Sequence, residues 1–203
     1  MLFVILVING TIVLDHSAKQ GFEHSVTWNG KTYVQKYYRH SGEGKTLART
    51  DRGFDLNEVE DDPNHDFLVV RSFLDQYNLV NEDYVIPKSG EITCVFWDYQ
   101  KFTDKPLTDV IAKIINNKKL DFTYSSDGLF LLKDGQELDS LNVGYNGCPV
   151  GTEYIGYIGK LNGKWVLCFN VKNDENTRKS TCDCYEIPEA DYKVLEEYLI
   201  IYD

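Results

Sequence analysis

Apolar and polar residues alternate along much of the chain, and this period of two predicts β-strands. Two hairpins stand out, over residues 25–38 around Asn29-Gly30 and over residues 154–170 around Asn162-Gly163. An Asn-Gly pair is typical of a two-residue type I′ turn, because both central residues need a positive φ. A tryptophan stands beside each turn, and we expect it to cover the hairpin face and fix the strand register.

Other short runs rich in β-branched and aromatic residues predict further strands. These runs cover residues 46–49, 54–59, 67–73, 84–86, 92–97, 120–124, 129–132 and 181–187. The runs 120–124 and 129–132 are expected to pair around Ser125–Gly128. Gly156 and Gly159 lie inside a predicted strand, which indicates a bulge or a close approach by a neighbouring group.

Two segments show the helical period instead. Residues 106–116 begin with a proline, which suits a first helical turn, and their apolar residues fall on one face. A second amphipathic helix is predicted over about 188–200, beginning at Pro188. The pattern therefore predicts an α+β fold, mainly antiparallel β-sheet hairpins with two amphipathic helices.

The 203 residues are enough for one domain or for two small modules. Pro87-Lys88-Ser89-Gly90 is the best candidate boundary, because proline and glycine interrupt regular structure there. We expect an apolar N-terminal segment and link over 1–24, a β-rich module over 25–87 and an α+β module over 91–203. The two modules could also pack as one domain.

The N-terminal segment allows two interpretations. Met1–Ile8 is uninterrupted apolar sequence, and Thr11–Leu14 resumes it after Asn9-Gly10. The stretch is shorter than the roughly 20 residues of a membrane-spanning helix. It is either a remnant of a signal sequence or a hairpin of core strands around Asn9-Gly10. Membrane association is left open.

The chain is acidic, with 21 basic and 32 acidic residues and a net charge of −11. Such a charge repels phosphate backbones and argues against nucleic-acid binding, whereas it favours a basic protein partner. Seven carboxylates lie within 51–66, directly after the mainly basic segment 31–50. The two segments either pair across a hairpin or form separate solvated faces. The residues predicted to contact a partner are Tyr37, Tyr38, Asp61, Asp62 and Asp66.

Five cysteines are present: Cys94, Cys148, Cys168, Cys182 and Cys184. Cys182 and Cys184 form the only close pair, and on a strand their side chains point to the same side. A metal site at this spacing normally needs a second Cys or His pair, and none accompanies it in the sequence. No metal, cofactor or disulfide framework is therefore predicted.

No motif for catalysis is complete. Gly42–Thr46 resembles the end of a phosphate-binding loop, but Arg39 stands where the first glycine is required. The acidic segment lacks the central glycine of an EF-hand. The four histidines, His16, His24, His40 and His65, show no triad pattern, and no Gly-x-Ser-x-Gly elbow exists. The sequence predicts a protein that is not an enzyme, with no catalytic residues assigned.

Several turn and strand segments carry a family resemblance. They are Trp28–Val34, Gly44–Leu47, Asp51–Gly53, Glu58-Val59 and Cys148–Trp165. With these segments the chain resembles small uncharacterised proteins of Gram-positive bacteria, many of which carry a signal peptide or a lipoprotein anchor. The resemblance implies a cell-surface setting and brings no catalytic residues. The chain departs from the lipoprotein pattern, since no cysteine follows the apolar start.

Three hypotheses for function follow, and the third is an enzyme that uses an unrecognised site. The first is a non-enzymatic binding protein that is extracytoplasmic or associated with the surface of a Gram-positive bacterium. The second is a cytoplasmic, acidic, immunity-type protein that occludes a basic toxin. The first relies on the apolar start and the resemblance, and the second on the charge, because acidic surfaces steer and hold basic partners.

Overall fold

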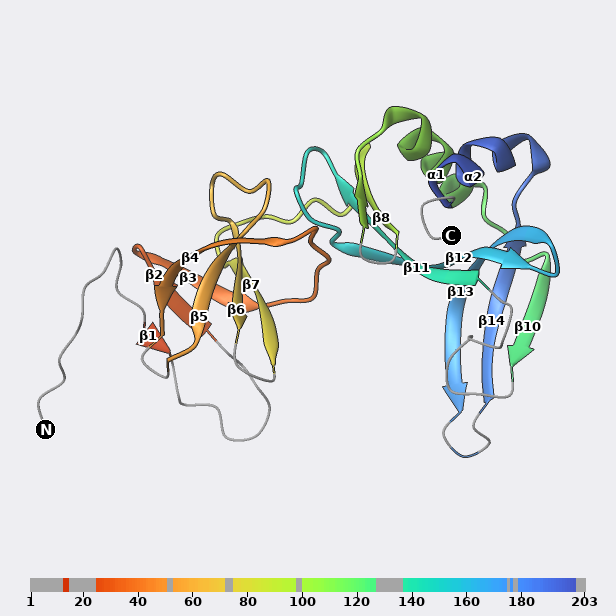
Figure 1. Ribbon diagram of the computed structural model, residues 1–203. Helices are drawn as coiled ribbons and strands as arrows, with labels where there is room; N and C mark the ends of the chain where they lie inside the picture. The colour runs from red at the N-terminus through yellow and green to blue at the C-terminus, as the bar shows by residue number, and fades with distance from the viewer. Residues whose placement is uncertain are drawn as a thin grey trace, which may run out of the picture. The chain divides into compact units, whose positions relative to one another are not determined.

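The computed structural model describes residues 13–14, 25–50, 53–71, 75–97, 100–126, 137–174, 176 and 179–199. The chain divides into two units, Met1–Ile86 and Pro87–Asp203. Each unit is built on one seven-stranded sheet in which all neighbouring strands are antiparallel (Figure 1). The prediction of a mainly antiparallel α+β fold is confirmed, although the two helices are short.

Unit 1 contains the first seven strands in the order β1-β2-β3-β7-β6-β5-β4. They are β1 (Val13–Leu14), β2 (Ser25–Trp28), β3 (Lys31–Gln35), β4 (Glu43–Arg49), β5 (Asp55–Val59), β6 (Phe67–Arg71) and β7 (Gln76–Asn81). A core of large apolar side chains covers one face of this sheet: Val26, Trp28, Tyr33, Leu56, Leu68, Val70 and Leu79. Of the N-terminal apolar stretch, only β1 lies within the described residues, where it pairs with β2.

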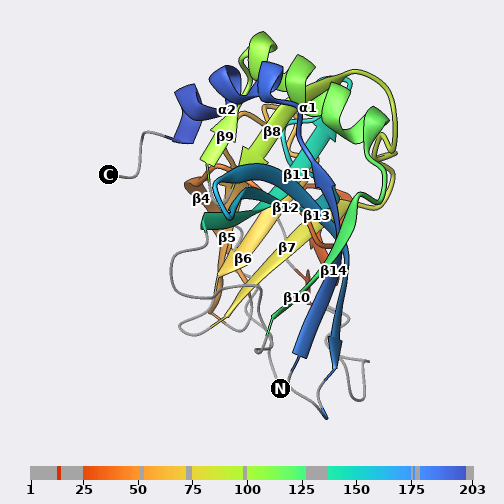
Figure 2. The same cartoon turned by 90° about the vertical axis from the view of Figure 1, so that its right-hand side faces the viewer.

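Unit 2 contains the other seven strands in the order β10-β14-β13-β12-β11-β8-β9. They are β8 (Ile92–Trp97), β9 (Gln100–Phe102), β10 (Phe122–Ser126), β11 (Glu137–Tyr145), β12 (Glu153–Leu161), β13 (Lys164–Asp174) and β14 (Lys179–Glu186). Helices α1 (Lys105–Asn117) and α2 (Tyr192–Leu199) lie over one face of the sheet (Figures 1 and 2). None of the described helices is long and apolar enough to cross a membrane.

The helices of unit 2 form because they have an apolar face to bury. Leu107, Ile111 and Ile114 of α1 are at most 1% exposed and pack with Trp165 and Leu167 of β13 in one core. Burial of such side chains contributes about 1.5–3 kcal/mol each. The predicted helix 106–116 is therefore confirmed, and the predicted helix 188–200 is a short 3₁₀ turn at Glu189–Asp191 followed by α2.

Several predicted strands need correction. Residues 84–86 form no strand. The strand in this region is β7, which the hydrophobic pattern does not predict because several of its residues are polar. Ser125-Ser126 belongs to β10 rather than to a turn, and β10 pairs with β14. The predicted partner strand 129–132 lies outside the described residues, as does the predicted Asn9-Gly10 turn.

The Asn-Gly turns have the predicted backbone. In the first hairpin Asn29 and Gly30 have φ values of 49° and 78°, and in the second Asn162 and Gly163 have 53° and 80°. Positive φ at both central residues is the signature of the type I′ turn. These turns set the register in which Trp28 pairs with Lys31 and Leu161 with Lys164.

A β-branched residue at such a turn should destabilise its hairpin. We expect Gly163→Val to lower the free energy of unfolding of unit 2 by about 1–3 kcal/mol, because an L-residue with a side chain is strained at positive φ. Space is not the obstacle, since a Cβ at Gly163 meets nothing within 4 Å. Urea unfolding followed by circular dichroism measures the loss. Asn162→Gly is the control, and an equal loss in both variants would contradict the backbone explanation.

Candidate functional site

Three cysteines from neighbouring strands meet in unit 2. The sulfur atoms of Cys168 on β13 and of Cys182 and Cys184 on β14 all lie within 4.8 Å of one another. The Cys184 Sγ lies 3.5 Å from the Cys168 Sγ and 3.7 Å from the Cys182 Sγ. Within the described part of the chain, this is the group of three or more His, Cys, Asp and Glu side chains that could hold a metal ion. We call it the thiol cluster.

A β-bulge brings Cys168 to the other two cysteines. Cys168 pairs directly with Cys184, but the register shifts by one residue between Phe169 and Lys172. Asn170, at the bulge, has a φ of 52° and donates a hydrogen bond from its side chain to Asp183 Oδ2 at 2.9 Å. Beside the hairpin turn, Lys172 pairs with Thr181. If this register continued along both strands without a bulge, Phe169 would lie opposite Cys184, and the Cys168 side chain would point to the other face of the sheet.

The thiol cluster lies on the sheet face that the helices do not cover. Side chains alternate along β13, so Trp165 and Leu167 enter the helix-covered core while Cys168 joins a second core. The three cysteines are at most 1% exposed. Apolar and aromatic side chains surround them: Leu138, Leu161 and Val166, with Tyr124, Tyr157 and Val171 partly buried beside them. The surroundings are therefore dry and suit soft sulfur ligands.

The three thiols also change one another's acidity. Hydrogen bonds from Cys168 and Cys184 to the Cys182 sulfur lower the pKa of the Cys182 thiol. The hydrogen bond to Cys182 raises the pKa of the Cys168 thiol, because it holds that proton in place. The three thiols therefore influence one another's acidity in opposite directions.

The other two cysteines provide a contrast. All five cysteines are buried, and none of them forms a disulfide bond. Cys94 donates from its Sγ to the Cys148 carbonyl oxygen at 3.4 Å. Burial raises the pKa of the Cys94 thiol to about 11. Cys94 therefore stays a protonated structural thiol, whereas Cys182 has neighbours that favour its ionisation.

The two tyrosines predicted to contact a partner have different environments. Tyr37 is 60% exposed, and the Arg39 guanidinium carbon lies 5.7 Å from its ring centroid. Tyr38 is 1% exposed and donates a hydrogen bond from its hydroxyl to the Leu68 carbonyl oxygen at 2.7 Å. Tyr37 is thus available on the surface, while Tyr38 packs inside unit 1.

The three aspartates of the predicted site also differ. Asp61 is exposed, with a φ of 63° in a turn. Asp62 is only 6% exposed and accepts a hydrogen bond from the Phe67 N–H at 2.7 Å. Burial raises the pKa of the Asp62 carboxyl. Asp66 is half-buried and lies 3.7 Å from the Lys31 Nζ. Asp62 therefore organises the turn, and Asp61 is the most accessible of the three.

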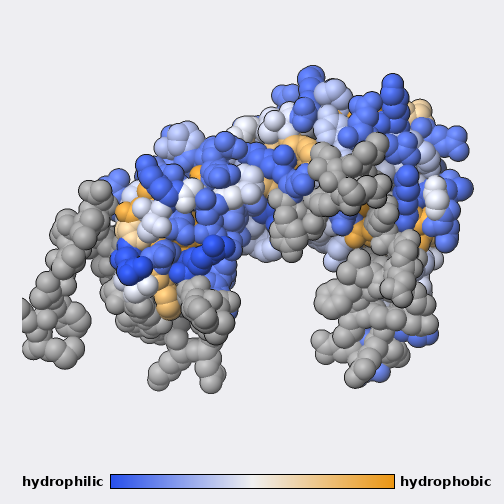
Figure 3. All heavy atoms as spheres, viewed as in Figure 1, coloured by the Kyte–Doolittle hydropathy of each residue, from blue (hydrophilic) through white to orange (hydrophobic). Residues whose placement is uncertain are grey.

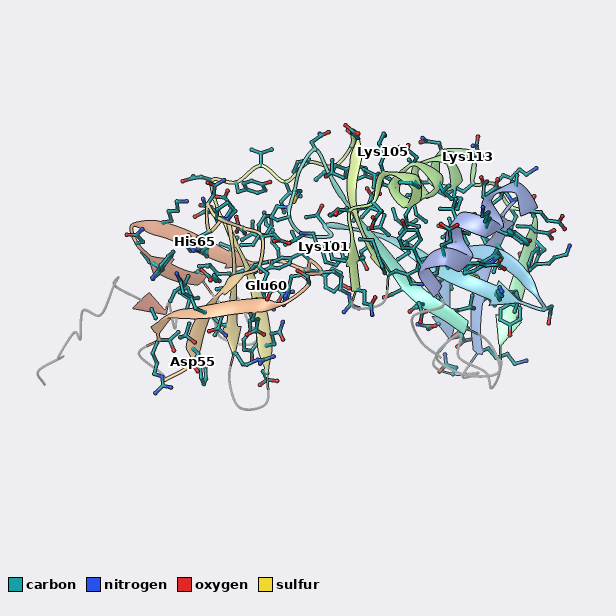
Figure 4. All side chains as sticks on the ribbon, turned by 45° about the horizontal axis from the view of Figure 1, so that its top comes forward. Asp55, Glu60, His65, Lys101, Lys105 and Lys113 are labelled. Carbon is teal, nitrogen blue, oxygen red and sulfur yellow. The ribbon has the colours of Figure 1, made fainter. Side chains whose placement is uncertain are left out.

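The fold adds a second acidic turn that the sequence analysis missed. Asn81, at the end of β7, donates its backbone N–H to the Asp66 carbonyl oxygen at 2.8 Å and its side chain to Asp66 Oδ1 at 3.2 Å. The turn that follows Asn81 thereby lies beside the turn that precedes Phe67. The exposed carboxylates of these two turns form what we call the acidic rim: Glu60, Asp61, Glu82 and Asp83. Figure 4 marks Glu60 and His65 in this part of unit 1.

The oppositely charged segments do pair across a hairpin. Between β4 and β5, Arg49 Nε lies 3.0 Å from Asp55 Oδ1, and Lys45 Nζ lies 4.0 Å from Glu58 Oε2. Both basic side chains are more than two-thirds exposed, so each pair contributes at most about 1 kcal/mol. On the face that Figure 3 shows, the part coloured by hydropathy is mostly hydrophilic, with small separate apolar areas.

Two of the four histidines lie within the described residues. His65 Nε2 lies 3.2 Å from Glu58 Oε2. His40 Nδ1 lies 3.2 Å from the Gly42 carbonyl oxygen, and its Nε2 lies 2.9 Å from the Gln76 side-chain nitrogen. This arrangement requires Nδ1 to donate and Nε2 to accept, and therefore favours the neutral imidazole.

His40 should make the stability of unit 1 depend on pH. Burial lowers the pKa of the His40 imidazole below its ordinary value of 6.5. The unfolded chain then binds a proton at higher pH than the folded chain, so the contribution is present above pH 6.5 and is lost as pH falls through the folded-state pKa. We expect unfolding free energy to fall more steeply on acidification in the wild type than in His40→Gln. Urea titrations across this range measure both slopes, and equal slopes would refute the assignment.

Comparisons with known proteins add no relative. No family model matches the chain, and neither a curated protein nor a solved structure is significantly similar to it.

Proposed function

We propose that the protein is a non-enzymatic binding protein whose unit 1 holds a basic protein partner at the acidic rim. The observation that carries this proposal is the pair of hydrogen bonds between Asn81 and Asp66, which brings two acidic turns together from separate parts of the chain. Four exposed carboxylates on adjoining turns concentrate negative charge where the backbone is held in place.

Charge supports the same partner class. The net charge of −11 attracts basic proteins over a long range, and the acidic rim adds a local target. The Lys31 Nζ lies 3.7 Å from Asp66 Oδ1 and donates to the Asn64 carbonyl oxygen at 3.2 Å. We expect an ammonium group of the partner to bind in the same way, beside a carboxylate and a turn carbonyl oxygen.

Tyr37 offers a second contact on unit 1. The backbone on both sides of it is fixed, because the Lys36 N–H donates to the Asn78 carbonyl oxygen at 3.0 Å and the Asn78 side chain donates to the Tyr38 carbonyl oxygen at 2.8 Å. An exposed tyrosine on a fixed backbone loses little conformational freedom on binding, and tyrosine is enriched at binding hot spots.

Cross-linking followed by charge neutralisation tests the proposal. A photo-reactive amino acid placed at Glu82 in cells that make the protein should capture a basic protein, which is then purified. Neutralising the rim with Glu60→Gln, Asp61→Asn, Glu82→Gln and Asp83→Asn should slow association about tenfold or more at low salt, with a smaller effect at high salt.

A matched variant removes the same number of charges from unit 2. It carries Glu91→Gln, Asp104→Asn, Glu189→Gln and Glu197→Gln, at four other exposed positions. If the acidic rim is the binding site, this control associates nearly as fast as the wild type. Equal slowing in both variants, or capture of no basic protein, would refute the proposal.

The compartment belongs to the same proposal. The apolar start and the resemblance favour a partner outside the cytoplasm, and fractionation of the source cells tests this separately. Full-length protein found only in the cytosol, bound to its basic partner, would support the immunity-type alternative instead.

A further inference from the structure

The thiol cluster of unit 2 plays no part in the proposed function. We propose that Cys168, Cys182 and Cys184 form a binding site for a soft monovalent cation of the Cu(I) class, bound by sulfur alone. The inference goes beyond partner binding, and it rests on the positions of three sulfur atoms on two hydrogen-bonded strands.

The spacing of the sulfur atoms fits a shared ion. Three sulfurs around one ion, each with a metal–sulfur bond of about 2.3 Å, lie about 4 Å apart. The observed separations from the Cys184 Sγ are 3.5 Å and 3.7 Å, and the remaining pair lies within 4.8 Å. Small side-chain rotations therefore suffice, and the β-strands that carry the ligands need not move.

The kinds and number of ligands favour Cu(I) over zinc. Structural zinc sites almost always have four ligands in a tetrahedron. Within the described residues, the group contains three cysteines and no His, Asp or Glu. Soft thiolates select Cu(I), which is stable with two or three sulfur ligands, and the buried apolar walls formed by Leu138, Leu161 and Val166 suit it.

The proton balance of binding is simple. Copper enters and remains as Cu(I), so no oxidant or reductant is needed. Each thiol that binds the ion loses its proton to solvent, and the S–H bond is replaced by a sulfur–copper bond. Because each binding thiol must lose its proton, the apparent affinity should rise with pH.

Anaerobic titration with Cu(I), in competition with a chromogenic Cu(I) chelator, tests the site. We expect the reduced wild-type protein to bind one Cu(I) ion per chain. Cys182→Ala and Cys184→Ala should each weaken Cu(I) binding by more than about 100-fold. Loss of a residue that binds the metal reduces affinity more than loss of a residue that only orients a ligand, which typically costs about 10–100-fold. Cys94→Ser is the matched control, since it changes an equally buried thiol of the same unit, and it should bind as the wild type does.

Other outcomes would overturn the proposal. They are no uptake, uptake that survives Cys182→Ala and Cys184→Ala, equal loss in Cys94→Ser, or Zn(II) bound more tightly than Cu(I). If the cluster variants fail to fold, X-ray absorption of the copper-loaded wild type replaces them. A shell of three sulfur atoms supports the proposal, and a shell containing nitrogen or oxygen refutes it.

Discussion

Gly156→Ala should destabilise unit 2 by more than about 4 kcal/mol, because two independent penalties add at one position. Gly156 has a φ of 147°, which side-chain-bearing residues rarely adopt. A Cβ there would lie 2.1 Å from the Cys168 carbonyl oxygen and 3.1 Å from its carbonyl carbon. Both atoms belong to the backbone of β13, an interior strand between β14 and β12, so neither can move aside without breaking the sheet.

The consequence reaches the thiol cluster. The methyl group would push away the same residue that supplies one of the three sulfurs, so Gly156→Ala should disrupt β12, β13 and the cluster together. The control is Gly163→Ala, which also places a side chain at positive φ but meets nothing within 4 Å. Urea unfolding followed by circular dichroism compares the two variants. Similar losses in both would show that the close approach of β13 has no effect.

Trp165→Ala should produce the second large effect, a loss of about 3–5 kcal/mol in the unfolding free energy of unit 2. Trp165 is fully buried, and its ring centroid lies 5.7 Å from that of Trp97 in an edge-to-face arrangement. Truncation removes this contact and leaves a cavity beneath the helices.

Trp165→Phe separates volume from polarity. The Trp165 indole nitrogen is buried and has no hydrogen-bond partner among the described residues. Phenylalanine removes that unsatisfied N–H and keeps an aromatic ring, so we expect a loss below about 2 kcal/mol. Equilibrium unfolding measures both variants. A phenylalanine variant as unstable as the alanine variant would show that the ring contacts do not determine stability.

Local sequence patterns predicted the elements that depend mainly on the preferences of neighbouring residues in the chain. The two Asn-Gly hairpins follow from the φ preference of four residues, and α1 follows from a single apolar face. Strand β7 escaped prediction because Gln76, Asn78 and Asn81 make its pattern too polar. Its identity as a strand depends on hydrogen bonds to β3 and β6, which are tertiary contacts.

The candidate sites were harder to predict for the same reason. Period two correctly placed Cys182 and Cys184 on one side of their strand. Cys168 joins them only because a bulge at Asn170 shifts the register by one residue, and a bulge has no reliable sequence signal when no glycine marks it. The acidic rim likewise depends on the hydrogen bonds between Asp66 and Asn81, which are fifteen positions apart.

The arrangement of three thiols on β13 and β14 places their sulfur atoms within 4.8 Å of one another, close enough to bind one atom. Arsenite tests it directly, since one As(OH)₃ forms three As–S bonds with three neighbouring thiols and releases three water molecules. We predict an intact mass that corresponds to one arsenic per chain, with Cys168, Cys182 and Cys184 protected from alkylation and Cys94 and Cys148 alkylated after unfolding. No arsenic adduct, or protection of a different set of cysteines, would contradict the account.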